Sequence, residues 1–265
     1  MSGSTACRRH IIKNRRAASP AVSMVIITAA TVVLVLVSGS YALQVIQRQQ
    51  AASEFDTVQK SILAFDDAVR DIAWDRGGSR SIRFTTNYGN MRLMSSSKSF
   101  EIIAPGFSYS FTTAVVKYSM PSFYFTLGNG YSSYILGDEG TVVSSLTDSF
   151  GQVLVKQETD SASIALNYRV RVSREGPSTL VGSTYINYVD ILVIRLNCTD
   201  LSVGSGDFDL VAKNVGLTTY SYGPYSVGTG TISVVSEGVQ RNIQLDLGTG
   251  QVVFNLIIAD VRVST

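Results

Sequence analysis

Residues 17–47 read AASPAVSMVIITAATVVLVLVSGSYALQVIQ and contain no Asp, Glu, Lys or Arg. Within this stretch, residues 21–43 are almost wholly apolar. The hydrocarbon core of a bilayer needs about 20 such residues in a helix, and a helix that is apolar on all sides is unusual in a soluble domain. The β-branched residues would favour a strand in water, but lipid favours a helix because a helix satisfies its own backbone. The stretch therefore predicts a membrane-inserted helix, with Ser19 as its N-cap and Pro20 in its first turn.

The charged residues on either side of the apolar stretch predict its orientation. Only Arg48 follows the stretch before the first acidic residue, Glu54. Because positive charge stays in the cytoplasm, we expect the N-terminus inside and the bulk of the chain outside. The basic residues that precede the stretch are Arg8, Arg9, Lys13, Arg15 and Arg16.

The order of a basic cluster, two alanines, Ser-Pro and an apolar helix resembles the class III signal of archaeal type IV pilins and archaellins. The residues of this junction are Arg15, Arg16, Ala17, Ala18 and Ser19. The resemblance covers roughly residues 15–74 and implies that a prepilin peptidase cuts after Ala17 or Ala18. It removes the leader, residues 1–18, and leaves the helix on the mature chain. The motif is short, and a short motif can occur by chance. The alternative is therefore an uncleaved single-pass signal anchor.

Small residues interrupt the apolar stretch at four places that suit helix–helix contact. They are Ala29, Ala30, Ser38 and Gly39. Small side chains let two helices approach closely, which favours a bundle of helices from several copies. In a lone membrane anchor the same residues would carry little meaning.

A second pattern follows without a break and predicts that the helix continues over residues 19–74. Apolar residues alternate at spacings of four and three, which is typical of an amphipathic helix with a narrow seam. We expect the β domain of the same chain to cover this seam, which consists of Phe55, Val58, Ile62, Phe65, Val69 and Ile72. Gly77 and Gly78 end the helix, within a connector at 75–80. At 1.5 Å per residue the helix would be roughly 80 Å long.

Residues 81–265 predict an extracellular β domain, so that the fold class is α+β: a long N-terminal hydrophobic helix followed by a mainly antiparallel sandwich-like or barrel-like domain. Period-two alternation predicts half-buried strands, and dense Gly, Asn and Pro clusters predict the turns between them. The continuous apolar runs 191–194 and 252–258 predict strands buried on both faces. One domain is expected, although an interruption at 173–178 leaves open a division into two smaller sheets.

Composition argues against several classes of function. Without its five basic leader residues the chain keeps 17 basic and 20 acidic residues, a net charge near −3, which gives no case for nucleic-acid binding. Cys7 and His10 lie in the leader, so the mature chain has no pair of cysteines and no histidine. We expect no catalytic residue, no metal site and no cofactor. Carboxylates at Asp67, Asp71 and Asp75 share one helix face, and we interpret them as a solvated face rather than a calcium site.

Asn197-Cys198-Thr199 is an Asn-x-Thr sequon. On an exported domain Asn197 is a candidate for N-glycosylation. The alternative, which the sequence weights equally, is that Asn197 simply ends a strand.

The sequence thus predicts a structural protein: a subunit of an archaeal type IV pilus-like or archaellum-like filament that polymerises through its apolar helix and exposes its β domain for adhesion or surface interaction. The partners implied by the resemblance are further copies of the chain, the prepilin peptidase and the assembly machinery, with the cytoplasmic membrane holding the helix before assembly. The alternative is a membrane-anchored cell-surface binding protein or minor pseudopilin that does not polymerise. An anchored hydrolase is disfavoured because the mature chain lacks histidine.

Overall fold

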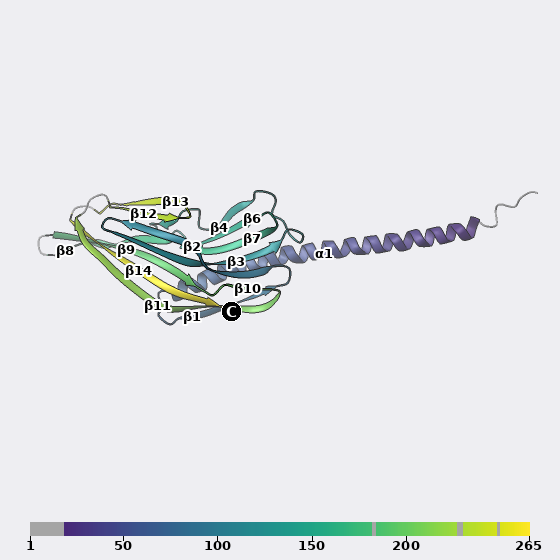
Figure 1. Ribbon diagram of the computed structural model, residues 1–265, viewed down its shortest axis with the longest axis horizontal. Helices are drawn as coiled ribbons and strands as arrows, with labels where there is room; N and C mark the ends of the chain where they lie inside the picture. The colour runs from purple at the N-terminus through teal and green to yellow at the C-terminus, as the bar shows by residue number, and fades with distance from the viewer. Residues whose placement is uncertain (1–18, 182–183, 227–229, 248–249) are drawn as a thin grey trace, which may run out of the picture. The chain divides into compact units, whose positions relative to one another are not determined.

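A computed structural model describes residues 19–181, 184–226, 230–247 and 250–265, with the backbone alone at 19–21 and 175–178. One long helix comes first, and strands make up the rest of the regular structure in these ranges (Figure 1). The predicted α+β class, a long N-terminal hydrophobic helix followed by a mostly antiparallel β-rich domain, is confirmed. The elements are α1 Ser19–Ala73, β1 Ser79–Thr86, β2 Asn90–Ala104, β3 Phe107–Pro121, β4 Ser132–Leu136, β5 Val142–Val143, β6 Gly151–Gln157, β7 Ser161–Tyr168, β8 Val170–Val181, β9 Thr184–Asn197, β10 Leu201–Val203, β11 Gly206–Ser226, β12 Gly230–Ser236, β13 Val239–Leu245 and β14 Gln251–Ser264.

Helix α1 belongs to two compact units of the chain. The first unit ends at Gln49 and the second runs from Gln50 to Thr265, so the second half of the helix is part of the β domain. In the first unit, α1 is long and apolar enough to cross a membrane, by length and composition only. Every residue from Val22 to Gln50 is exposed.

The strands of the second unit form two sheets among the described residues. One has six strands in the order β1-β11-β14-β9-β8-β5. The other follows the order β13-β12-β2-β3-β7-β6-β4, with β10 paired to β2. Pairing is antiparallel except between β14 and β9 and between β5 and β8. Register shifts in β2, β8 and β11 mark bulges, which bend strands and let both sheets curl.

Two clusters of buried apolar side chains hold the sheets together. The first combines the seam of α1 with both sheets, and its strand members include Phe84, Leu210 and Val261 of the six-stranded sheet and Met91, Val116 and Ile164 of the other. The second contains no helix residue and joins the sheets directly, through residues such as Phe100, Ile102 and Ile232 on one side and Val189, Leu256 and Phe254 on the other. The second half of α1 therefore fills one end of a sandwich whose other end closes sheet on sheet.

The chain is not divided at residues 173–178. Strand β8 continues through them from Val170 to Val181 and pairs with β9 on both sides of a register shift between Glu175 and Thr179. A bulge absorbs the extra residues, so the Gly-Pro interruption bends a strand instead of ending a sheet.

The run 252–258 is not buried on both faces as its composition predicted. Along β14 the side chains alternate, with Val252, Phe254 and Leu256 buried and the residues between them half-exposed. The outer face of the six-stranded sheet is open to solvent here, although apolar residues occupy part of it.

Candidate functional site: the long helix and its anchorage

The exposed half of α1 presents large apolar side chains on all sides. Met24, Val25 and Val35 expose 73, 69 and 70% of their surface. The small residues Ala29, Ala30, Ser38 and Gly39 are exposed among them, and a side-chain carbon built at Gly39 would meet no atom within 4 Å. This segment is too apolar to be stable facing water, because apolar area left in water costs about 25 cal/mol per Å². It needs a covering.

Several hydroxyl groups of this segment donate to backbone carbonyl groups of the helix itself. Thr28 Oγ1 donates to the carbonyl oxygen of Met24 at 2.8 Å, and Ser40 Oγ donates to that of Val37 at 2.9 Å. Such bonds remove the cost of placing a hydroxyl in an apolar environment. These hydroxyl groups therefore do not oppose contact with lipid or with another helix.

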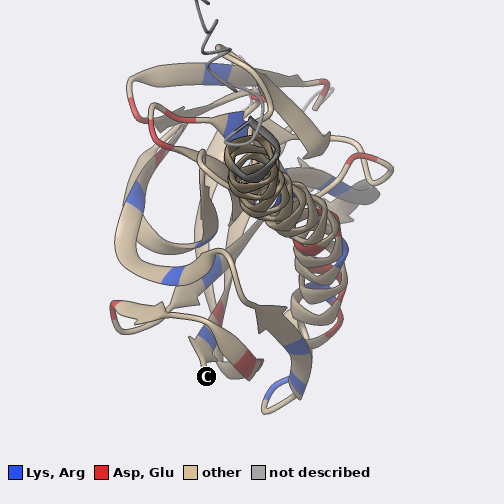
Figure 2. Cartoon of the chain, turned by 90° about the vertical axis from the view of Figure 1, so that its right-hand side faces the viewer, with Lys and Arg blue, Asp and Glu red and all other residues tan. Residues whose placement is uncertain are grey.

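Charge is confined to the second half of the helix. Residues 21–47 contain no Asp, Glu, Lys or Arg, whereas the acidic and basic residues of α1, coloured red and blue in Figure 2, lie beyond them. The helix thus changes from a wholly apolar rod to an amphipathic one near Gln50, where the β domain begins.

The predicted seam residues all lie in the core of the β domain. Phe55, Val58, Ile62, Phe65, Val69 and Ile72 expose between 0 and 4% of their surface. Near the start of the seam, the Phe55 ring lies 4.7 Å from that of Phe125 and 6.1 Å from that of Tyr118. The spacing of four and three places these side chains on one face, and both sheets pack against it.

Glu54 fastens the beginning of this half to the loop between β1 and β2. Its buried carboxylate accepts the backbone N–H groups of Asn87, Tyr88 and Gly89 at 2.8–3.2 Å, and the hydroxyl of Tyr118 at 2.7 Å. Burial and the hydrogen bond to Glu54 raise the pKa of Tyr118 above its ordinary value. Four donors converging on one carboxylate make a charge-assisted anchor.

Asn214 fastens the other end. The last carbonyl groups of a helix have no partner within it, and here Asn214 Nδ2 donates to the carbonyl oxygens of Ile72 and Ala73 at 3.1 and 2.6 Å. The Trp74 ring meets the edge of Phe150 at 6.2 Å. The helix is held at both ends of its domain half.

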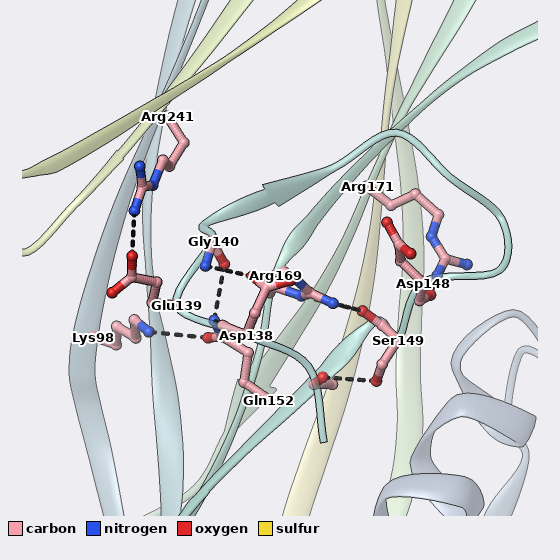
Figure 3. Close-up of polar contacts among 11 residues, drawn as sticks. Lys98, Asp138, Glu139, Gly140, Asp148, Ser149, Gln152, Arg169, Arg171 and Arg241 are labelled. Atoms are coloured by element: carbon pink, nitrogen blue, oxygen red, sulfur yellow. Dashed lines mark hydrogen bonds and ion pairs between the residues drawn. The ribbon is translucent and has the colours of Figure 1, made fainter. Parts of the chain in front are cut away.

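Arg169 holds together the place where the chain passes from one sheet to the other. It is the single residue between β7 and β8, and its side chain is 1% exposed. Its Nη1 donates to Asp138 Oδ1 at 2.9 Å, and its Nε and Nη2 donate to the carbonyl oxygen of Ser149 (Figure 3). Because these bonds tie two loops to the crossing, we interpret Arg169 as a structural cross-link.

The neighbouring polar groups complete the same network. Gln152 donates to the carbonyl oxygens of Asp138 and Gly140, and Lys98 Nζ donates to Asn167 Oδ1 at 3.1 Å. The Gly140 N–H and the Arg169 guanidinium hold the pKa of Asp138 below its ordinary value, whereas burial lowers the pKa of Lys98. The groups bind one another, so this cluster offers no open chemistry.

Of the remaining predicted residues, the structure describes Ser19, the helix carboxylates and Asn197 but not the rest of the leader junction. Arg15, Arg16, Ala17 and Ala18 lie outside the described residues, and Ser19 is the first residue of α1. Asp67 and Asp71 pair with Arg70 and Arg80, and no group of three metal-ligating side chains occurs in the described part of the chain. Asn197 ends β9 and is exposed, with its Nδ2 donating to Asp260 at 3.2 Å.

Searches of protein-family models, curated proteins and solved structures find no match to this chain. The proposals below therefore depend on its sequence and geometry.

Sequence reasoning missed the anchors at Glu54, Asn214 and Arg169. In the sequence Glu54 is simply the first acidic residue after the apolar stretch. A signal was present, because Glu54 immediately precedes Phe55 of the seam and so lies at its edge. For Asn214 and Arg169 no local pattern exists, since their partners are 141 and 31 residues away in the sequence.

Proposed function

We propose that this chain is a structural subunit of an archaeal type IV pilus-like or archaellum-like surface filament. Residues 1–18 are a class III leader that a prepilin peptidase removes. The apolar half of the helix is held in the cytoplasmic membrane before assembly and polymerises with other copies afterwards. The β domain lies outside the cell and provides adhesion or surface interaction. The role is structural and requires no catalytic residue.

One observation supports this proposal above the others. The first half of a single helix is apolar and exposed on all sides, whereas the second half packs its seam into a domain core. Val22 to Ile46 carries large exposed apolar side chains, whereas the seam side chains between Phe55 and Ile72 are buried. Lipid or other copies of the same segment are the coverings that suit a rod of this kind. The leader motif at Arg15–Ser19 favours copies, because its peptidase substrates assemble into filaments.

Purification of filaments sheared from the cell surface tests the proposal. The subunit is expected to be this chain, beginning at Ala18 or Ser19. A filament subunit that begins at Met1 would refute the cleavage, and the absence of this chain from the sheared material would refute the assembly.

A paired substitution separates a filament subunit from a lone anchor. Gly39→Leu keeps the segment apolar but fills a position that close helix packing requires. Val35→Leu is the matched control, because Val35 is already large and 70% exposed. Both variants are expected in the membrane fraction, and Gly39→Leu alone is expected to lose filaments.

The alternative function is a single-pass surface binding protein or minor pseudopilin. The anchorage at Glu54 and Asn214 favours it equally, because any displayed domain needs a firm connection to its helix. If this is the function, the wild-type chain stays in the detergent-soluble membrane fraction and never pellets with sheared fibres.

A further inference from the structure

The loop between β3 and β4 carries an unusual concentration of aromatic residues and no charge. Residues 118–137 contain no Asp, Glu, Lys or Arg. Within them, Phe123 exposes 66% and Tyr131 41% of their surface. Exposed apolar rings in a long uncharged segment point to a contact surface. We call residues 121–131 the aromatic loop.

Hydrogen bonds to Gln157 and to Asp160 hold the aromatic loop in place. The side chain of Gln157 accepts the N–H of Leu127 at 2.9 Å and donates to Ser122 Oγ at 3.0 Å. The N–H of Ser122 also donates to the carbonyl oxygen of Asp160 at 2.9 Å. The exposure of Phe123 therefore belongs to an ordered surface.

The loop packs on the first turns of the domain half of α1. Phe125 points inward and lies 4.7 Å from Phe55, while Tyr124 meets Tyr88 edge-on at 5.1 Å and Phe123 at 5.2 Å. The Tyr88 hydroxyl in turn donates to Gln50 Oε1 at 2.5 Å. Phe123 thus ends a row of edge-on rings that begins at Tyr88, whose hydroxyl is hydrogen-bonded to the helix.

Gln50, the helix residue that Tyr88 contacts, follows Ile46, the last large exposed apolar residue of α1, by one helical turn. Tyr side chains concentrate at the level of lipid headgroups, where the ring meets acyl chains and the hydroxyl meets water, and Phe side chains enter the boundary between headgroups and acyl chains. An uncharged loop that exposes both is suited to that layer.

We propose that the aromatic loop rests on the headgroup layer of the bilayer while the chain is in the membrane, with Phe123 and Tyr131 as the rings that contact lipid. The inference rests on the proposed membrane-inserted state and is independent of filament formation. The contact would attach the β domain to the membrane surface before assembly, and it would have to break when the subunit leaves the membrane.

Tryptophan fluorescence of the full-length chain in lipid vesicles tests this contact. Trp74 is the only tryptophan, so each probe is placed in a Trp74→Phe background. Phe123→Trp reports on the loop, and Tyr131→Trp is a second probe in case the first disturbs folding. Leu146→Trp is the matched control: Leu146 is 75% exposed, and it precedes Phe150, which contacts Trp74 at the other end of the domain helix. Val35→Trp reports on insertion of the helix.

The vesicles contain phosphatidylcholine brominated on the upper part of its acyl chains. The probes at 123 and 131 are expected to emit at shorter wavelength than the probe at 146 and to be quenched by bromine, while the probe at 146 is not quenched. Equal emission and no quenching at all three positions, with the probe at 35 quenched, would refute the loop contact alone. An unquenched probe at 35 would refute membrane insertion and with it this inference. A blue shift at 123 and 131 only in assembled filaments would assign the loop to a neighbouring subunit and overturn the lipid contact.

Discussion

Removing the second half of α1 should unfold the β domain, although every strand would remain. A fragment that starts at Ser79 keeps both sheets, whereas a fragment that starts at Gln50 also keeps the seam of the helix. The six seam side chains are buried almost completely. Burying each stabilises by about 1.5–3 kcal/mol, so together they contribute roughly 9–18 kcal/mol. A domain has a free energy of unfolding of only about 5–15 kcal/mol.

Removing this half of the helix would also take away the acceptors that Glu54 and the last helix carbonyl groups provide. The N–H groups of Asn87, Tyr88 and Gly89 would lose their acceptor, and Asn214 would lose both of its carbonyl partners. Each buried group left without a partner costs about 1–3 kcal/mol. We therefore expect the shorter fragment to be unfolded or molten, not merely less stable.

Circular dichroism and thermal unfolding of the two fragments provide the measurement. The fragment 50–265 is expected to give near-ultraviolet signals of packed aromatic side chains and a cooperative transition. The fragment 79–265 should lose both, and a synthetic peptide of residues 50–76 added in trans should restore them. If the shorter fragment melts cooperatively at the same temperature as the longer one, the helix contributes nothing to the stability of the sandwich and the prediction is wrong.

Three further outcomes follow from single contacts. Glu54→Gln removes the charge from an acceptor of four donors and should lower the free energy of unfolding by about 1.5–3 kcal/mol in urea titration. Asp56→Asn, which changes an exposed carboxylate two residues away, should leave it unchanged, and equal effects would mean that the anchor contributes nothing specific. Gly151→Ala places a carbon 2.2 Å from the buried Asp66 carboxylate, so overpacking should cost about 1–3 kcal/mol by the same titration, and a neutral result would show that the helix and β6 are less closely packed than the structure has them. The pKa of Asp138 is lowered in the folded state, so its ionised form stabilises the fold above its ordinary pKa near 4, and this stability is lost as pH falls through the native pKa. The melting temperatures of the wild type and Asp138→Asn should therefore converge between about pH 4 and pH 2. A constant difference between them would contradict the linkage.

The local patterns of the sequence were sufficient for the elements. The apolar run at 21–43 and the spacing of the seam predict one long helix over 19–74, and the structure has it at Ser19–Ala73. Period-two alternation likewise predicts a β-rich remainder. These features depend on which side chains recur at 3.6 or 2 residues, so neighbours in the chain are enough to reveal them.

Local patterns were weaker on interruptions and faces. Gly176 and Pro177 left a division into two smaller sheets open beside the expected single domain, and the pairing of β8 with β9 on either side of them continues the strand. The run 252–258 is mostly apolar and was predicted to be buried on both faces, yet within it only one face of β14 is buried. An apolar composition shows that a strand can be buried, whereas its actual burial depends on whether another sheet packs against that face.

The sequence by itself determined that the chain has a wholly apolar helical half and an amphipathic one, and that strands follow. The tertiary structure decided what the amphipathic half does: it fills one end of a sandwich and is fastened at Glu54 and Asn214 by partners more than 30 and 140 residues away. The physical reason is that periodicity is a property of neighbours along the chain, while closing a core and satisfying buried polar groups depend on contacts between segments that only the folded chain brings together.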